Sequence, residues 1–551
     1  MGSGKDRRVY SRIYRYGLIS EILRRQSKMT FTGCIEKIKT ALKSVPGSAF
    51  LAALAGGLIA HMIVITNNWP NHDGLASEYF DQNMITSGRW FLGTACGISS
   101  YFAVPWIIGL LALLYLAFAA GITASLLELK SRIAAVFTGL LMASFPALAS
   151  GFAYIFTMDG YMLGLLCGVL AVYFTKKYKT GFIEGMVLLA LSLGSYQAYL
   201  PVVIMLCIFC VCNILSEEGK IKDKILKSLK FLYMGAGGAV IYYVMLRVLL
   251  LIQGKTLDTY QGIDEGLGAG ASGFGIAGMY RDFAAFTVRS GVFVPNLFAA
   301  VALGLLTAAF VVVFVGTCAR KGWFKKPWIY VIACIFCVIL PAVMNIVMFV
   351  SGDVTYHAIM RYQWVLIPIG MIAFCDRYGD VFGNGKAMKK DFFLSWIVAA
   401  GAGVLIFCYI LSDNIGYTNL QKKYERTYAY CERLLDRIEQ TEGYYRGIPV
   451  AMIGVVSTDE YPEVDLTGAV TDGLIGLNGD YLLYKNRDYG YFIKYYLGAE
   501  LNIIEGDRIA EIYNSPEYVA MDSFPGKDSV KVVNGIMYVK TENIDKTLRG
   551  E

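Results

Sequence analysis

Two carboxylate residues border long apolar segments and are the first candidates for chemistry. Asp73 follows an apolar run that ends near Thr66, and Asp159 lies in the turn at 157–161 between two further apolar runs. A carboxylate at the centre of a bilayer costs roughly 3 kcal/mol, so acids beside spanning segments usually face protein or water and are often functional. Such a group can serve as a general base, a role worth about 10²–10⁴ in rate. The alternatives are a solvated loop acid for Asp73 and a turn residue or helix N-cap for Asp159.

Four arginines also lie in polar loops next to long apolar segments, and they could hold a phosphate group. They are Arg89, Arg281, Arg289 and Arg361. The planar guanidinium matches the spacing of phosphate oxygens, whereas a lysine ammonium acts as a point charge. A base and a phosphate-binding cation are what transfer from a phosphate leaving group to a hydroxyl requires. Each arginine could instead anchor a helix end at the membrane interface.

Aromatic and amide side chains in these loops could bind a sugar. They are Trp69, Trp90, Tyr196, Gln197 and Tyr199. Interfacial Trp and Tyr are also enriched in membrane proteins of every function, so a purely anchoring role is the alternative. His72 adjoins Asp73, which leaves a metal site open. We therefore assign no metal ligands and expect no specific cofactor, with a divalent metal as the open alternative.

The elements that position these residues are membrane helices. The chain has 551 residues, 56% of them hydrophobic and 17% charged. A spanning helix needs about 20 apolar residues. The sequence predicts a polytopic α-helical membrane protein with about 11 spans. They lie near 46–66, 104–127, 132–151, 160–175, 181–197, 199–215, 231–252, 293–317, 328–350, 362–375 and 392–411.

The distribution of Lys and Arg predicts the orientation of these spans. With the N-terminus in the cytoplasm, the inside segments carry 29 Lys and Arg, and the outside loops between the spans carry 5. Cytoplasmic loops are enriched in these residues. An odd number of spans then places residues 412–551 outside, together with both acids and all four arginines.

Three regions follow from composition. Residues 1–45 form a basic amphipathic segment, 46–411 form the transmembrane domain, and 412–551 form a soluble domain. The last region has a net charge of −8, against +15 for residues 1–411. An apolar stripe at 420–438, a strand at 448–456 and the hairpin signal Asn534-Gly535 predict an α/β or α+β domain. Gly268, Gly270 and Gly273 match a dinucleotide-binding pattern, but no βαβ unit surrounds them, and a flexible loop is the better interpretation.

Several short motifs resemble those of a known family. Asp73 followed by Ser87-Gly88-Arg89-Trp90 is similar to the first periplasmic loop of the bacteriophage serotype-conversion glucosyltransferases (Gtr, type II). The motif at 195–201, the turn at 159–161 and the segment at 444–454 fit the same pattern. The resemblance covers roughly residues 48–460.

The resemblance implies a GT-C-type enzyme in a bacterial inner membrane. Such an enzyme takes a sugar, here by default glucose, from a polyprenyl phosphate and transfers it with inversion to a cell-surface glycan. The acceptor class stays open among O-antigen, teichoic acid and other surface glycans. Asp73 occupies the place of the usual base and Asp159 that of a second acid. Membrane lipids are the other expected partner, and no nucleic acid is expected.

Two other functions are compatible with the same topology. A transporter or flippase of lipid-linked saccharides would line its path with charged residues inside the spans, for which Arg247 and Glu184 are among the few candidates. A surface-polysaccharide polymerase is the third hypothesis. Use of a polyprenyl-phosphate sugar distinguishes the first hypothesis from the other two.

Overall fold

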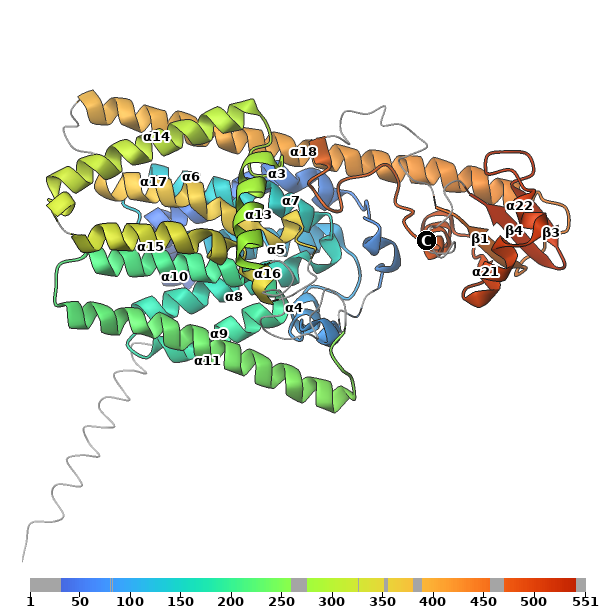
Figure 1. Cartoon of the computed structure of the whole chain (residues 1–551), viewed down its shortest axis with the longest axis horizontal. Coiled ribbons are helices and arrows are strands. Elements are labelled where there is room, and N and C mark those ends of the chain that lie inside the picture. Colours follow the sequence, from blue (N-terminus) through green and yellow to red (C-terminus); the bar gives the residue numbers. More distant parts are fainter. Residues whose placement is uncertain are drawn as a thin grey trace, which may run out of the picture.

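Long apolar helices lie side by side in one bundle, and a small domain with a sheet lies beyond one end of it (Figure 1). We call this the domain end of the bundle and the opposite one the far end. The computed structural model describes residues 31–79, 81, 83–258, 275–325, 327–350, 355–379, 389–455 and 470–541. The glycine-rich pattern at Gly268, Gly270 and Gly273 and the first 30 residues lie outside the described residues.

Every predicted span falls on a helix. The bundle helices are α3 (Val45–Thr66), α5 (Pro105–Leu126), α6 (Arg132–Ser144), α7 (Pro146–Phe152), α8 (Met158–Lys177), α9 (Gly181–Ser195), α10 (Leu200–Ser216), α11 (Ile221–Gln253), α14 (Leu297–Arg320), α15 (Pro327–Met344), α16 (Ile346–Val350), α17 (Leu366–Tyr378) and α18 (Lys389–Glu439). Among the described residues, seven helices are long and apolar enough to cross a membrane, or eight if the bent pair α6 and α7 is one span. The chain is thus a membrane protein, and the count of eleven stays a prediction, because α9 and α17 have only 15 and 13 residues.

Capping residues and prolines set where these helices begin. The side chains of Ser44, Ser131 and Asn296 accept hydrogen bonds from the first turns of α3, α6 and α14. Such caps satisfy backbone N–H groups that have no partner within the helix. Pro146 starts α7 because proline is tolerated only in the first turn. Its position explains the 45° bend between α6 and α7.

Helix α18 joins the bundle to the C-terminal domain. It has 51 residues, which corresponds to a length of roughly 75 Å. The helix expected at 420–438 therefore continues directly from the last predicted span, across residues 411 and 412 (Figure 1). Gly416 lies on this stretch, and a Cβ atom there would be 2.7 Å from Leu477 Cδ1. Helix and C-terminal domain are in close contact at this point.

The described part of the C-terminal domain contains a four-stranded sheet. Its strand order is β2 (Asn502–Ile503), β1 (Pro449–Ile453), β4 (Ile536–Lys540) and β3 (Val530–Val533), with β1 parallel to both neighbours. β3 and β4 form the hairpin predicted from Asn534-Gly535, whose φ angles of 49° and 75° suit a two-residue turn. The strand predicted at 448–456 is β1. Short helices α20 (Asn486–Phe492), α21 (Asp507–Tyr513) and α22 (Pro516–Val519) complete the domain.

The loops at the domain end carry short elements of their own. The first loop contains the 3-10 helices η1 (Asp73–Ala76) and η2 (Ile85–Ser87) and the helix α4 (Leu92–Cys96). Helix α13 (Gly275–Arg289) lies across the long helices rather than along them (Figure 1). The sequence predicts that these loops share one face of the membrane.

Candidate functional site

Asp73 begins the single turn η1, seven residues after α3 ends at Thr66. The turn is closed locally, because Asn71 Oδ1 accepts a hydrogen bond from the Gly74 N–H at 2.8 Å and Asp73 O accepts one from the Ser77 hydroxyl at 3.1 Å. The Asp73 side chain is 56% exposed. The structure thus presents this carboxylate to solvent at the domain end, where an incoming hydroxyl could reach it.

The His72 ring lies beside this carboxylate, with Nε2 3.6 Å from Asp73 Oδ1. The ring packs on Tyr484 of the C-terminal domain at a centroid distance of 4.6 Å and edge-on against Tyr154 at 6.2 Å. Burial lowers the pKa of His72, Asp73 opposes this, and Lys423 adds to the lowering. At neutral pH the imidazole is therefore mainly uncharged.

Lys423 is a fully buried lysine on α18, beyond the apolar part of that helix. Its Nζ donates to the backbone oxygen of Asn478 at 2.5 Å and to the Tyr484 hydroxyl at 3.2 Å. Burial lowers the pKa of Lys423 to about 7, and nearby Asp480 opposes the shift. The amine connects α18 to the same tyrosine that packs on His72.

Residues 470–484, which we call the cover segment, lie against the loops of the domain end. A Cβ atom at Gly476 would be 2.9 Å from both Ala153 Cβ and Tyr154 Cε2, and one at Gly473 would be 2.6 Å from Ser290 O. Gly476 also has a φ of +85°, which only glycine adopts readily. These glycines permit direct contact between the C-terminal domain and the bundle.

A cavity of about 300 Å³ lies between the cover segment and the bundle. Its wall includes Phe286, Tyr356, His357 and Arg361 from the bundle, and Asp472 and Asn478 from the cover segment. This volume is at the lower end of the range for ligand pockets. Aromatic faces with a few polar groups match the chemistry of a saccharide.

Arg361 is buried in the wall of this cavity, with its charge already paired. Its Nη1 and Nη2 donate to the two carboxylate oxygens of Asp282 on α13, at 2.5 and 2.8 Å, and its Nε donates to Tyr356 O at 3.1 Å. The guanidinium also lies over the rings of Phe286 and Tyr356, at 4.4 and 3.9 Å. A phosphate would have to share this arginine with Asp282.

The two motifs around Arg89 and Tyr196 form one junction. Arg89 Nη1 donates to the Tyr161 hydroxyl at 3.2 Å, and its guanidinium lies 5.1 Å from the Tyr196 ring, which stacks on Tyr161 at 4.5 Å. Tyr196 lies near Tyr154 and Tyr356. The junction is therefore close to Tyr154, whose ring lies edge-on against His72, and to Tyr356 in one wall of the cavity.

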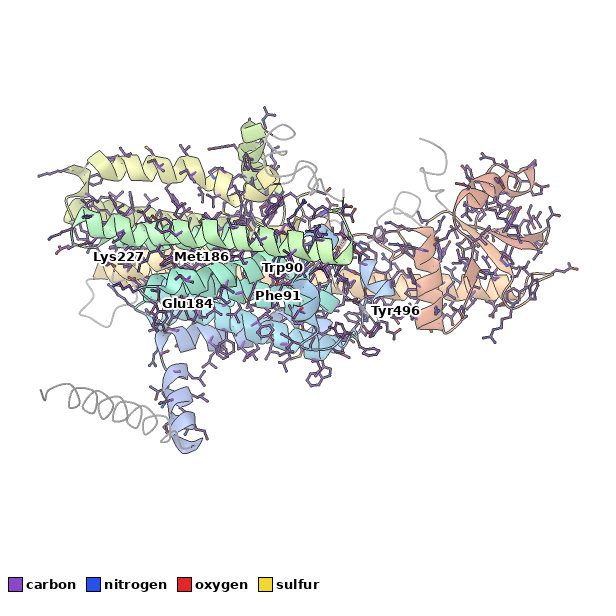
Figure 2. All side chains as sticks on the ribbon, turned by 90° about the horizontal axis from the view of Figure 1, so that it is seen from below. Trp90, Phe91, Glu184, Met186, Lys227 and Tyr496 are labelled. Carbon is purple, nitrogen blue, oxygen red and sulfur yellow. The ribbon has the colours of Figure 1, made fainter. Side chains whose placement is uncertain are left out.

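Gln197 and Trp90 hold this junction together. The Gln197 amide donates to Ser87 O at 3.0 Å and lies 3.1 Å from the Tyr242 hydroxyl, which itself donates to Gly88 O. A Cβ atom at Gly194 would be 2.7 Å from the Trp90 ring. Trp90 and Phe91 lie on the side of the bundle beside α11 (Figure 2). Gln197 and Trp90 thus pack the two loops of this junction against each other.

The remaining predicted residues lie around this centre. Asp159 is buried in the first turn of α8, where Oδ1 accepts from the Gly160 N–H at 2.8 Å, while Oδ2 has no partner among the described residues. Arg281 and Arg289 are exposed on α13, Trp69 is half-buried, and Tyr199 is buried against Tyr196. From separate segments of the chain, the structure brings together Arg89 and Tyr196.

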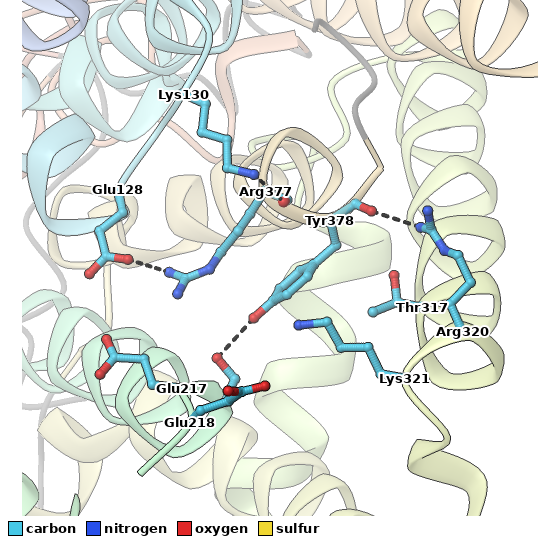
Figure 3. A pocket seen from close by; sticks show the side chains of 10 residues that line it. Glu128, Lys130, Glu217, Glu218, Thr317, Arg320, Lys321, Arg377 and Tyr378 are labelled. Atoms are coloured by element: carbon cyan, nitrogen blue, oxygen red, sulfur yellow. Dashed lines mark hydrogen bonds and ion pairs between the residues drawn. The ribbon is translucent and has the colours of Figure 1, made fainter. Parts of the chain in front are cut away.

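A second cavity, of about 630 Å³, lies at the far end (Figure 3). Of its charged groups, Glu128 accepts from Arg377 at 2.5 Å and also from Lys176, outside the cavity, at 2.6 Å. Arg320 donates to the backbone oxygen of Tyr378 at 2.8 Å. These bonds connect loops at the far end, away from Asp73.

Sequence reasoning named no residue of the C-terminal domain as part of the site. Lys423 follows Leu420 by three residues, in phase with the apolar stripe, so its burial had a signal in the periodicity. No comparable pattern in the sequence marked Tyr484 or Asn478. Across the stretches that the structure describes, no three His, Cys, Asp or Glu side chains are grouped as a metal site would require.

One comparison with known proteins gives a match to the chain. A family model described as Glucosyl transferase GtrII matches residues 62–374. That range contains every site residue predicted from the sequence and ends before the C-terminal domain. Curated proteins and solved structures give no match to the chain.

Proposed function

The chain belongs to the GtrII glucosyl transferase family, and from this premise we propose that it transfers glucose from a polyprenyl phosphate to a cell-surface glycan. The transfer takes place on the outer face of the bacterial inner membrane and inverts the anomeric carbon. The transmembrane domain is of the GT-C class in this proposal, with the N-terminus in the cytoplasm and residues 412–551 outside. A glycan acceptor and a lipid-linked donor are its partners.

The observation that carries the proposal is the exposed carboxylate of Asp73 at the domain end. Asp73 takes the proton of the acceptor hydroxyl while the hydroxyl oxygen bonds to C1 of the glucose. The bond between C1 and the phosphate oxygen breaks, and polyprenyl phosphate leaves with the electron pair. A positioned carboxylate base of this kind is worth about 10²–10⁴ in rate.

The proposed phosphate ligands differ in what they can offer. Arg89 is oriented by the Tyr161 hydroxyl and the Tyr196 ring. Arg361 is paired with Asp282 and has to exchange this partner for the phosphate. Arg281 and Arg289 are exposed on α13, so they are proposed to meet the donor as it enters from the membrane surface.

The saccharide itself is proposed to bind in the cavity beneath the cover segment. Tyr196, Tyr199, Trp90 and Gln197 do not line this cavity, and they are proposed to contact the sugar from the junction of the two loops, where Gln197 fixes the backbone of the first loop. Trp69 lies on the first loop together with Asp73 and is half-buried. Asp159 is proposed as a second acid that acts from within the bundle.

A transporter of lipid-linked saccharides is supported less well. Arg247 and Glu184 are both exposed on the surface of the bundle, so they do not line a path between helices. A path for a charged headgroup would need such residues inside, because charge in the bilayer must be paired or hydrated.

The test of the proposal is donor use. Proteoliposomes that contain the protein and a glycan acceptor are supplied with labelled polyprenyl-phosphate glucose or with a nucleotide-linked glucose. We expect label to appear in the glycan only from the lipid donor, with release of polyprenyl phosphate. Movement of the lipid across the bilayer without cleavage would establish the transporter instead.

A further inference from the structure

Leu75, two residues after Asp73, is a core residue of the C-terminal domain. Its side chain is 1% exposed and lies in a cluster with Tyr430, Leu434 and Tyr489, all of which belong to the C-terminal half of the chain. The turn that carries Asp73 is therefore packed into a domain that begins more than 330 residues later in the sequence.

Two further contacts secure the same turn. On one side of Asp73, the His72 ring packs on Tyr484, whose hydroxyl bonds to buried Lys423. On the other, η1 contacts α20 of the C-terminal domain. Asp73 thus lies between two anchored residues, with its own carboxylate exposed.

The turn has little stability of its own. η1 has four residues, and an isolated single turn of helix is unstable in water because nucleation costs more than one hydrogen bond returns. Its local bonds are those of Asn71 and Ser77. Burial of Leu75 supplies the apolar stabilisation that the loop itself lacks.

We infer that the C-terminal domain is a positioning element for Asp73, with Leu75 as the positioning residue. This inference rests on the proposed role of Asp73 as the base. A domain that only captured the acceptor would change the KM for the acceptor. A domain that positions the base changes kcat, because displacing a reacting group by about 1 Å can cost roughly 10² in rate.

The experiment compares Leu75→Ala with Leu434→Ala. Leu434 is buried in the same core on α18, so both variants remove the same atoms from one cluster, but only the first releases the loop. We expect kcat to fall at least tenfold in Leu75→Ala, with the donor KM unchanged, and to stay within about threefold in Leu434→Ala. Leu75→Met, which keeps the volume, should restore kcat.

Hydrogen exchange provides the second measurement. In Leu75→Ala the amides of residues 72–77 should exchange faster, while those of 430–438 stay protected. Wild-type kcat in Leu75→Ala, or a change confined to the acceptor KM, would overturn the inference. If Leu75→Ala keeps wild-type kcat while Asp73→Asn is inactive in the same assay, only the inference about Leu75 fails. If Asp73→Asn is active, the proposed role of Asp73 as the base fails as well.

Discussion

The ion pair between Arg361 and Asp282 should be the main tether of α13 to the bundle. Asp282→Asn keeps the shape of the side chain but removes its charge. The Arg361 side chain is 7% exposed and that of Asp282 25%, so the remaining cation cannot be fully hydrated. Removing one partner of a buried pair costs about 3–5 kcal/mol. We expect Asp282→Asn to lower the free energy of unfolding by about 3 kcal/mol, at the low end of this range, because the Asn oxygen still accepts one hydrogen bond.

A double-mutant cycle measures the coupling directly. Arg361→Met replaces the guanidinium with an apolar side chain that can pack on Phe286 and Tyr356. If the pair interacts as the geometry indicates, Arg361→Met with Asp282→Asn should lose less free energy of unfolding than the two single changes added together. The expected coupling is about 1.5–3 kcal/mol, measured by unfolding in mixed micelles.

Strictly additive losses would refute this reasoning. The same variants also test the proposed phosphate role. If Arg361 binds the donor phosphate, Asp282→Asn removes its competitor and should tighten donor binding, while Arg361→Lys should weaken it through loss of the bidentate geometry. If neither variant changes donor affinity, Arg361 only anchors α13.

Three other predictions concern pH, backbone geometry and topology. The pKa of Lys423 is lowered to about 7 from an ordinary 10.5, so between these pH values the folded protein binds fewer protons than the unfolded chain. Stability should therefore rise from pH 7 to pH 9. Lys423→Met should flatten this rise, measured as Tm against pH. Gly88→Ala should cost activity, since its Cβ would clash with Gln197 and Tyr242, whereas Gly254→Ala, also at positive φ but with no atom within 4 Å, is the control for backbone strain alone. A reporter at Glu551 should be labelled by a membrane-impermeant reagent in intact spheroplasts, and labelling only after lysis would reverse the proposed orientation.

Features that depend on local sequence were predictable. Apolar runs located every bundle helix, and Asn534-Gly535 located the β3–β4 hairpin, because each depends on neighbouring residues. The bend at Pro146 was not separated from a continuous span, since hydropathy does not register a change of direction. The continuity of α18 was not predicted either, because its polar residues after position 411 indicated the start of a new element.

The site residues show where such reasoning stops. Arg361 was singled out for its type and position, but its partner Asp282 lies 79 residues away and had no signal of its own. Leu75 reads as an ordinary loop residue until the C-terminal domain is folded around it. Pairings over such distances are decided by tertiary packing, which periodicity and charge counts do not contain.

Single-turnover transfer by Asp73→Asn tests the central claim most directly. Asp81→Asn is the matched control, because it makes the same change in the same loop at another exposed acid. With saturating lipid-linked donor, we expect the rate of transfer in Asp73→Asn to fall at least ~10²-fold while donor binding is kept, and the rate in Asp81→Asn to stay near wild type. Near wild-type transfer by Asp73→Asn would contradict the account.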